Sequence, residues 1–416
     1  MEDTPVRVTG RLIAALALMT AVAPLALDMY LPAFPAMAQE LGTTATGVQL
    51  TLTACLAGLG LGQLFIGPMS DALGRRRLLL LGTAICAVTG VACALAPNVE
   101  LLALGRFLQG LSGAAGVVLA RSVVSDTSRG QAAARLLGVL MIINVVAPVV
   151  APLSGGAIVA FASWRAVFWV QAALALLASV CTLVWVRESL PKSARARGGL
   201  SATFSAVRET LTSRTYVAYL LTFCFAFAAL FAYISASPFV MQQVIGLSSG
   251  MYSLLFGLNA LVVVATSAVA AALAGRVPYR RMIAVGLTVA VLSAVGLAVC
   301  VSAGVPTVPT LVLFAVFQGS MGPIFANATT LALAETGKHA GTGSAFLGFL
   351  QFLLAAAISP LVGIAGENSA APMVIAILVS IALATVAFAV LPDKSTETER
   401  ENSTEGDLST TVATSE

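Results

Sequence analysis

Twelve apolar runs, most of them about 20 residues long, constrain this chain of 416 residues more than any other feature. A helix needs about 20 apolar residues to cross the hydrocarbon core of a bilayer. The hydrophobic share of 59% and the mean hydropathy of +0.97 exceed the composition of soluble domains. We therefore predict an all-α polytopic membrane protein. The runs lie near residues 12–31, 48–69, 78–96, 100–120, 133–158, 166–186, 215–240, 250–274, 282–303, 310–333, 343–364 and 372–391.

The positions of the basic residues predict the orientation. If both termini are cytoplasmic, all but two of the 22 Lys and Arg residues lie on the cytoplasmic side, and the exceptions are Arg106 and Arg165. This distribution satisfies the positive-inside rule, whereas the opposite orientation exports clusters such as residues 75–77. The net charge of +4 is thus a topology signal, and we expect no nucleic-acid partner. The first run continues into the polar residues near Asp28 without a small-residue cleavage site, so we expect a retained helix.

Two polar stretches divide the chain. Residues 187–214 are rich in Arg and predict a cytoplasmic linker between an N-terminal six-helix bundle, 1–186, and a C-terminal six-helix bundle, 215–391. Residues 392–416 are acidic and rich in Ser and Thr, a composition that cannot bury a core. We expect a disordered cytoplasmic tail there, with no role in the function of the bundles.

The two halves are related by an internal repeat. The segment Gly42–Gly82 encloses the second run and the loop after it, and Gly246–Gly286 encloses the eighth run and its loop in the same way. A common offset of about 204 residues places Arg76 and Arg77 on Arg280 and Arg281. Parallel repeats of six helices are one way in which transporters are built, with a substrate site between the halves near the midplane.

Asp28 and Arg106 are the only charged residues that lie three or more residues from both ends of an apolar run. Asp28 precedes Pro32 by four residues and Arg106 follows Glu100 by six, so both lie about 6 to 9 Å inside the same face and can meet. An ionised group at this depth is costly and is functional by default. One interpretation is a static ion pair that pins two helices. The other, which we prefer, is a proton-binding carboxylate with a cationic partner, as in proton relays.

The repeat breaks at this pair, because Arg106 aligns with Ala315 and Asp28 with residues 232–234. Coupling chemistry is therefore expected in the first half only. The second half offers mainly apolar, aromatic and amide groups, a mixture that suits a moderately lipophilic solute. Ordinary helix packing is the alternative for each such residue. The candidate cavity residues are Tyr30, Gln109, Asn144, Phe231, Tyr233, Asn259, Gln318 and Gln351.

Cysteine and histidine give no sign of a metal site. The six cysteines are scattered through the runs without paired spacing, so we expect reduced core residues, and His339 is the single histidine. The short loops carry no nucleotide-binding glycine loop, HExxH motif or serine elbow. We predict no metal, no cofactor and no enzymatic activity, although a sensor or membrane enzyme stays a poorly supported alternative.

The loop after the second run carries a specific motif. Gly67-Pro-Met-Ser-Asp-Ala-Leu-Gly-Arg-Arg-Arg77 resembles the signature between spans two and three of the major facilitator superfamily. Its glycines permit a tight turn, and its carboxylate and guanidinium groups can form a charge network. The resemblance implies a conformational latch, while a purely topogenic role for the arginines is the alternative. The latch residues are Gly67, Asp71, Gly74, Arg75, Arg76 and Asp126.

Two further stretches narrow the resemblance. Leu104–Gly110 is similar to the span-four motif that carries the proton-linked arginine of drug:proton antiporters, and Asn144–Gly156 is similar to their span-five antiporter motif. In the second stretch two prolines kink the helix and a glycine pair permits close approach of a neighbour. The motif residues are Pro148, Pro152, Gly155 and Gly156.

Four shorter segments resemble the bicyclomycin/chloramphenicol-resistance (Bcr/CflA-type) branch of these antiporters. The segments are Asp28–Pro32, Arg121–Asp126, Trp164–Phe168 and Ser235–Val240. The resemblance extends over residues 11–392. It departs at residues 144–147, where the wider superfamily often has glycines, and in the second copy of the loop signature, which keeps only Gly275 and the two arginines.

The resemblance implies two six-helix bundles related by a pseudo-two-fold axis. It also implies a monomeric, proton-coupled antiporter in the bacterial cytoplasmic (inner) membrane that exports small amphipathic drugs or metabolites. The proton gradient is then the energy source and no cofactor is needed. A proton-coupled uptake symporter for a small organic solute shares the fold and is the alternative function.

Overall fold

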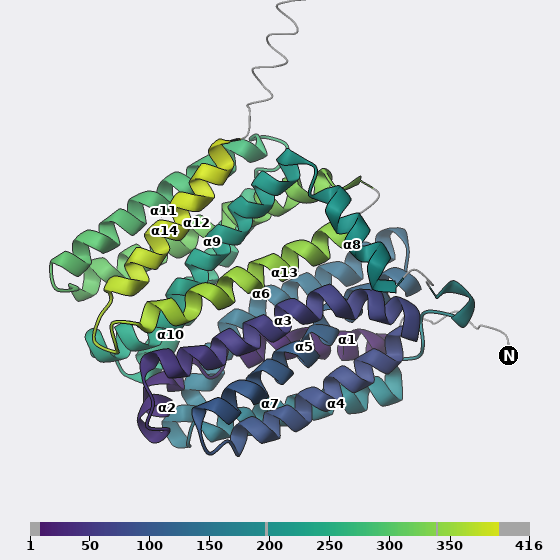
Figure 1. The fold of residues 1–416 in the computed structure, drawn as a ribbon, viewed down its shortest axis with the longest axis horizontal. Coiled ribbons are helices and arrows are strands. Elements are labelled where there is room, and N and C mark those ends of the chain that lie inside the picture. The colour runs from purple at the N-terminus through teal and green to yellow at the C-terminus, as the bar shows by residue number, and fades with distance from the viewer. Residues whose placement is uncertain (1–8, 196–198, 338–339, 391–416) are drawn as a thin grey trace, which may run out of the picture.

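A computed structural model of the protein describes residues 9–195, 199–337 and 340–390, and all regular secondary structure in these ranges is helical (Figure 1). Twelve helical segments within them are long and apolar enough to cross a membrane. The prediction of twelve spans is thus confirmed. The predicted tail, 392–416, and His339 lie outside the described residues.

The first half contains α1 (Gly10–Asp28), η1 (Leu31–Ala33), α2 (Phe34–Glu40), α3 (Ala45–Leu73), α4 (Arg75–Ala94), α5 (Val99–Thr127), α6 (Gly130–Phe161) and α7 (Arg165–Trp185). The segment between the halves contains η2 (Lys192–Ala194) and α8 (Gly199–Thr210). The second half contains α9 (Arg214–Phe239), η3 (Val240–Val244), α10 (Ser249–Ala272), α11 (Tyr279–Ser302), α12 (Thr307–Ala334), α13 (Ala340–Ile358), η5 (Ser359–Gly363) and α14 (Ala371–Ala389).

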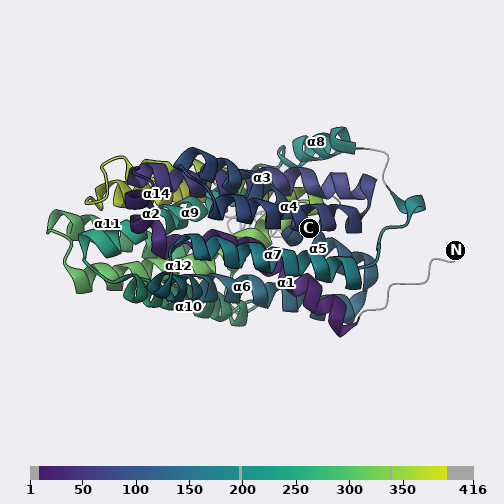
Figure 2. The same ribbon diagram turned by 90° about the horizontal axis from the view of Figure 1, so that it is seen from below.

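The two ends of the helical bundle differ in the elements that they carry. The short helix α2 lies at one end and α8 at the other in both Figure 1 and Figure 2. We call the end with α8 and the turn between α3 and α4 the linker face, and the end with α2 the far face. The helix α8 packs against α3 and α13, one from each half. The sequence predicted only a polar linker here, so this helix is an addition to that prediction.

Side-chain caps and glycine turns set the helix boundaries. Thr44 Oγ1 accepts a hydrogen bond of 3.2 Å from the backbone N–H of Gly47, and Asn98 Oδ1 accepts one of 2.9 Å from that of Leu101. Such caps satisfy backbone donors that have no partner within the helix. Gly74 separates α3 from α4 with a φ of +98°, a conformation that favours glycine. The turn between the second and third spans therefore needs this residue.

The first span is longer than the apolar run indicates. We expected it to end near Pro32, but helical structure continues through η1 and α2 as far as Glu40. Pro32 and Pro35 both occupy the first turn of these short helices. A missing N–H has no cost at that position, so the prolines start new helices there and do not end the helical segment.

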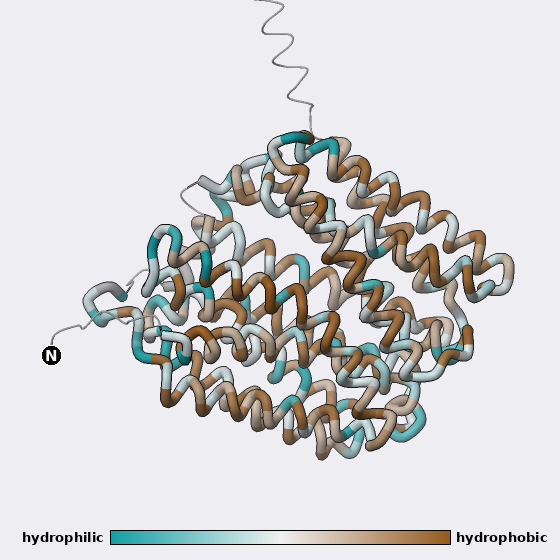
Figure 3. Tube along the Cα trace, turned by 180° about the vertical axis from the view of Figure 1, so that it is seen from behind, coloured by the Kyte–Doolittle hydropathy of each residue, from teal (hydrophilic) through white to brown (hydrophobic). Residues whose placement is uncertain are grey.

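The helices are largely apolar along their length, and hydrophilic residues gather mainly near their ends and in the turns (Figure 3). Many large apolar side chains are exposed on the outside of the bundle, among them Val88, Leu292 and Ile142. A surface of this kind belongs in hydrocarbon and not in water. All six cysteines are free and buried, as the sequence predicted.

Candidate functional site

Arg106 of α5 is a completely buried charged side chain in the first half. Its Nη1 donates a hydrogen bond of 2.6 Å to Oε1 of Gln109, and Nε2 of Gln109 donates one of 3.2 Å to Oε1 of Gln171 on α7. Within the part of the chain that the structure describes, Nε and Nη2 of Arg106 have no hydrogen-bond partner. Buried donors without partners are costly, so this guanidinium is a candidate to bind another group.

Two aromatic rings hold the Arg106 guanidinium. Its Cζ lies 4.2 Å from the ring centroid of Tyr30 and 5.7 Å from that of Phe168. A guanidinium over a ring face gains a cation–π attraction that grows as water is excluded. The hydroxyl groups of Tyr30 and Thr51 are 3.3 Å apart, so Tyr30 is held at both its ring and its hydroxyl.

Asp28 is the last residue of α1 and is only 7% exposed. Among the described residues, the Asp28 carboxylate has no hydrogen-bond partner and no ion-pair partner. The ion pairs among them join Arg75 to Asp71 and Asp126, Arg165 to Glu40, and Arg195 to Glu188. Asp28 and Arg106 are therefore not in direct contact in this conformation, in which Tyr30 covers one face of the guanidinium. Their coupling role stays a prediction.

In the second half, the structure brings two of the predicted cavity residues together. Nδ2 of Asn259 donates a hydrogen bond of 2.9 Å to the Tyr233 hydroxyl, and the Tyr233 ring lies 5.1 Å from the ring of Phe314. Gln318 is also buried, and its Oε1 has no partner among the described residues. This half thus supplies aromatic and amide groups, as the sequence predicted.

The other predicted cavity residues are not in these clusters. The ring of Phe231 packs on Phe227 at 4.8 Å, and Asn144 donates a hydrogen bond of 2.9 Å to the carbonyl of Leu140 on its own helix. Gln351 is half-buried. Within the described ranges, no hydrogen bond or ring contact joins the candidates of one half to those of the other.

The glycine pair in α6 brings two other elements close. A Cβ on Gly155 would meet backbone atoms of Met29, directly after α1, and a Cβ on Gly156 would meet the side chain of Ser253 on α10. Pro148 and Pro152 lie inside the same helix. The expected close approach at this motif is confirmed, and it places α6 against both α1 and the second half.

A charge network surrounds Arg75 at the linker face. Its guanidinium contacts Asp71 Oδ1 at 2.6 Å and Asp126 Oδ2 at 3.1 Å, and its backbone N–H donates a hydrogen bond of 2.9 Å to Oε1 of Glu188. Asp126 also accepts a hydrogen bond of 2.9 Å from Ser189. The network thus ties the turn after α3 to the end of α5 and to the start of the linker.

The other predicted latch residues have different neighbours. Arg76 donates a hydrogen bond of 2.9 Å to the carbonyl of Leu183 near the end of α7. A Cβ on Gly67 would meet only Val118 Cγ1, at 3.9 Å, so close packing does not require this glycine. Sequence reasoning missed Glu188 and Ser189. An acidic residue directly after the sixth span, in a predominantly basic linker, was the available signal.

The two halves contact each other at the far face. Gln242 Nε2 donates a hydrogen bond of 3.2 Å to the carbonyl of Pro32, and Gln49 Nε2 donates one of 3.2 Å to that of Ser235. The rings of Phe34 and Phe239 lie 6.0 Å apart.

At the linker face, a pocket of about 450 Å³ lies between α3 and α5 of the first half and α13 of the second. Its polar lining includes Gln63, Asp71, Arg121, Asp126 and Thr342. The halves thus touch at the far face, and a polar pocket lies between them at the linker face.

Comparison with known families decides the class of the chain. The model of the Major Facilitator Superfamily matches residues 16–360. The chain belongs to the Major Facilitator Superfamily. It is therefore a multi-pass membrane protein of a transporter family, and the predicted fold, two six-helix bundles, is confirmed.

Individual relatives agree with this assignment. The chain is 36% identical to the uncharacterized MFS-type transporter YdgK of Bacillus subtilis, over 90% of this chain and 93% of that protein. It is 28% identical to a bicyclomycin resistance protein homolog of Haemophilus influenzae, over 92% of this chain and 96% of that protein. A D-xylose-proton symporter structure superposes with a TM-score of 0.71 at 12% identity, over 92% of this chain and 98% of that one, and so supports the fold alone.

Proposed function

We propose that this protein is a proton-coupled antiporter that exports small amphipathic drugs or metabolites across the bacterial cytoplasmic membrane. The observation that carries the proposal is the fully buried Arg106, whose Nε and Nη2 lack partners among the described residues, in the same half as the buried Asp28. Relatives named for bicyclomycin resistance and multidrug resistance support the substrate class.

In this proposal Asp28 carries the exchanged proton. A proton from outside binds the carboxylate and cancels its charge, which removes its attraction to Arg106. Reorientation of the halves then exposes the site to the cytoplasm, where the proton is released and a drug binds. Proton and drug shift the equilibrium only to the extent that each binds one state better than the other.

The substrate is bound between the halves. Tyr30 and Gln109 supply the side toward Arg106, and Tyr233, Asn259 and Gln318 supply the opposite side. With the linker face in the cytoplasm, the present arrangement is closed to the outside, and the pocket between α5 and α13 lies on the cytoplasmic side. We infer that this orientation holds, since it places nearly all Lys and Arg residues in the cytoplasm.

The network around Arg75 acts as the latch in the opposite state. Here Asp71 and Asp126 are paired with Arg75 within the first half. When the linker face closes, Asp71 comes toward α13, which already lines the same pocket. The two bundles, 1–186 and 215–391, move as units joined by the linker, and the monomer is the working form.

Drug handling in cells tests the proposal. A host that lacks its own drug pumps is compared with and without the protein, first in a panel of drugs and then with a fluorescent lipophilic dye. We expect raised resistance to some amphipathic drugs and lower dye accumulation, both abolished by a protonophore. Higher accumulation of the solute under the same gradient indicates the uptake symporter and contradicts the proposal.

A further inference from the structure

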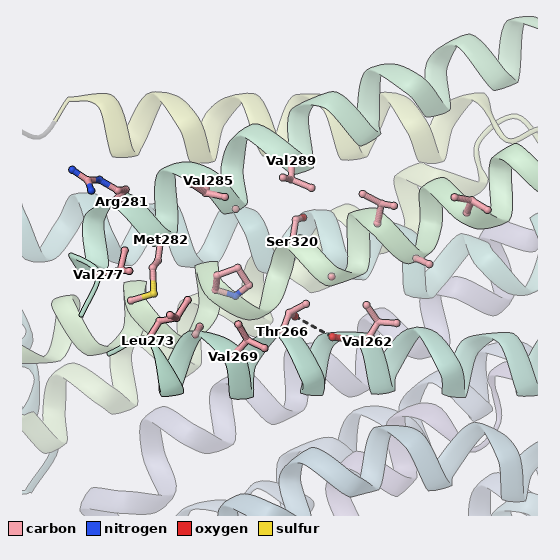
Figure 4. A pocket seen from close by; sticks show the side chains of 17 residues that line it. Val262, Thr266, Val269, Leu273, Val277, Arg281, Met282, Val285, Val289 and Ser320 are labelled. Carbon is pink, nitrogen blue, oxygen red and sulfur yellow. Dashed lines mark hydrogen bonds between the residues drawn. The ribbon is translucent and has the colours of Figure 1, made fainter. Parts of the chain in front are cut away.

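The second half has an apolar groove on its outer surface that the transport cycle does not use. The groove has a volume of about 710 Å³ and lies between α10, α11 and α12 (Figure 4). The lining side chains of Val269, Val285 and Val316 are 58%, 58% and 43% exposed. The groove therefore opens on the surface that faces lipid.

The internal repeat allows the packing at this groove to be compared with the first half. In the first half Gly110 of α5 faces α3, and a Cβ there would lie 3.1 Å from the Cα of Cys55. The equivalent Gly319 of α12 faces side chains of α10 instead, with Val262 Cγ1 at 3.1 Å from the position of its Cβ. The helix α3 therefore packs on α5 backbone to backbone at this position, whereas side chains of Val262 and Thr266 lie between α10 and α12 at Gly319. One turn further along, at Gly322, α10 and α12 approach closely again, because an added Cβ there would lie 2.6 Å from the backbone nitrogen of Ser267.

The repeat offset of 204 shows which residues differ between the two halves at this place. Gly58 and Gly62 of α3, whose added Cβ atoms would meet backbone atoms of α5, correspond to Val262 and Thr266 of α10. Both Val262 and Thr266 line the groove. Two larger residues thus line the groove at positions where the first half has packing glycines.

The two hydroxyl groups in the lining are satisfied by their own helices. The Thr266 hydroxyl donates a hydrogen bond of 3.0 Å to the carbonyl of Val262, which Figure 4 shows, and the Ser320 hydroxyl donates one of 2.6 Å to that of Phe317. The groove thus offers its occupant apolar contact and almost no hydrogen bonds. An aliphatic chain matches that chemistry.

The length of the groove and the positive charge at its end indicate the acyl chain of an anionic lipid. Along α10 the groove runs from Val262 to Leu273, which corresponds to about 16 Å, or roughly half of a hydrocarbon core of about 30 Å. Arg281 stands at its linker-face end (Figure 4) and has no partner among the described residues. Its neighbour Arg280 packs over the ring of Phe388 at 5.0 Å and does not line the groove.

We propose that this groove binds one acyl chain of an anionic phospholipid in the leaflet at the linker face, with the lipid phosphate at Arg281. Basic residues at the cytoplasmic end of a cleft between spans are a known way of holding anionic headgroups. The site is independent of the proposed transport activity.

Native mass spectrometry of the purified full-length protein tests the headgroup. The protein is mixed with equal amounts of dioleoyl phosphatidylglycerol and dioleoyl phosphatidylcholine, which share acyl chains and differ in charge. We expect the wild type to retain phosphatidylglycerol preferentially. Arg281→Gln should reduce that preference about fivefold, the effect of one basic residue near a membrane surface. Arg280→Gln is the matched control and should keep it. Equal effects of the two substitutions, or no preference in the wild type, overturn the proposal.

The acyl chain is tested by filling the groove. Val285→Trp places an indole in the groove from α11, and Val299→Trp changes an equally exposed residue of the same helix outside it. We expect Val285→Trp to lower retention of both lipids and Val299→Trp to have no effect. Val316→Trp fills the groove from α12 and replaces Val285→Trp if that variant does not fold. Unchanged retention in the groove-filling variant overturns the proposal.

Discussion

Gly155→Ala should destabilise the contact between α6 and the end of α1. The added Cβ meets the carbonyl and Cα of Met29, which are backbone atoms, so no side-chain rotation can relieve the clash. Overpacking of this kind costs about 1 to 3 kcal/mol. Alanine also gains about 1 kcal/mol over glycine from helix propensity, which leaves a net loss of about 0 to 2 kcal/mol.

Gly138→Ala provides the matched control. Gly138 lies in the same helix, and a Cβ there has no atom within 4 Å. The propensity gain is common to both variants and cancels, so Gly155→Ala should be less stable than Gly138→Ala by about 1 to 3 kcal/mol. Denaturant unfolding of both proteins in one detergent, followed by circular dichroism, measures the difference. Equal stability of the two variants refutes the packing argument at this motif.

Three further predictions concern the latch, the tail and the far-face contact. Asp71→Asn should reduce turnover about tenfold, a change of about 1.4 kcal/mol in the barrier, while substrate binding measured by ligand titration stays within twofold; equal loss of both contradicts the latch. Truncation after Lys394 should leave transport at wild-type level in a dye efflux assay, because the removed segment is polar and acidic; a large loss at equal membrane abundance refutes this. Gln49→Leu removes the 3.2 Å hydrogen bond to Ser235, and one buried hydrogen bond contributes about 1 kcal/mol. In a protein with Phe239→Cys, it should therefore raise the labelling of that cysteine by an external thiol reagent several-fold. Unchanged labelling contradicts closure at this face.

The sequence predicted the spans well because lipid demands long apolar helices, and this signal is local. It missed the extension past Pro32, since a proline at the first turn of a new helix looks like the end of the old one. Close packing at Gly155 was expected from the residue type, and the structure added the partner, Met29. Partners depend on tertiary arrangement, which composition and spacing do not contain.

At the candidate site too, the sequence did not give the tertiary contacts. Counting residues placed Asp28 and Arg106 at one depth, but depth does not give side-chain direction. In the structure Tyr30 lies against the guanidinium, and Gln109 accepts its hydrogen bond. Tyr30 and Gln109 were both expected to line the substrate cavity. The sequence pattern did not indicate that their side chains contact Arg106. Glu188 contacts Arg75 across 113 residues of sequence, a separation at which spacing arguments carry no information.

Asp28 is the residue proposed to carry the exchanged proton. The direct measurement is drug efflux from proteoliposomes with an imposed pH gradient, compared for wild type and Asp28→Asn. The amide keeps the shape of the side chain and cannot exchange the proton, so gradient-driven efflux should vanish while downhill drug movement persists. Arg106→Ala is measured beside it, and it should impair coupling without abolishing proton binding at Asp28. Full gradient-driven efflux by Asp28→Asn contradicts proton coupling at Asp28 and leaves Asp28 and Arg106 with a structural role only.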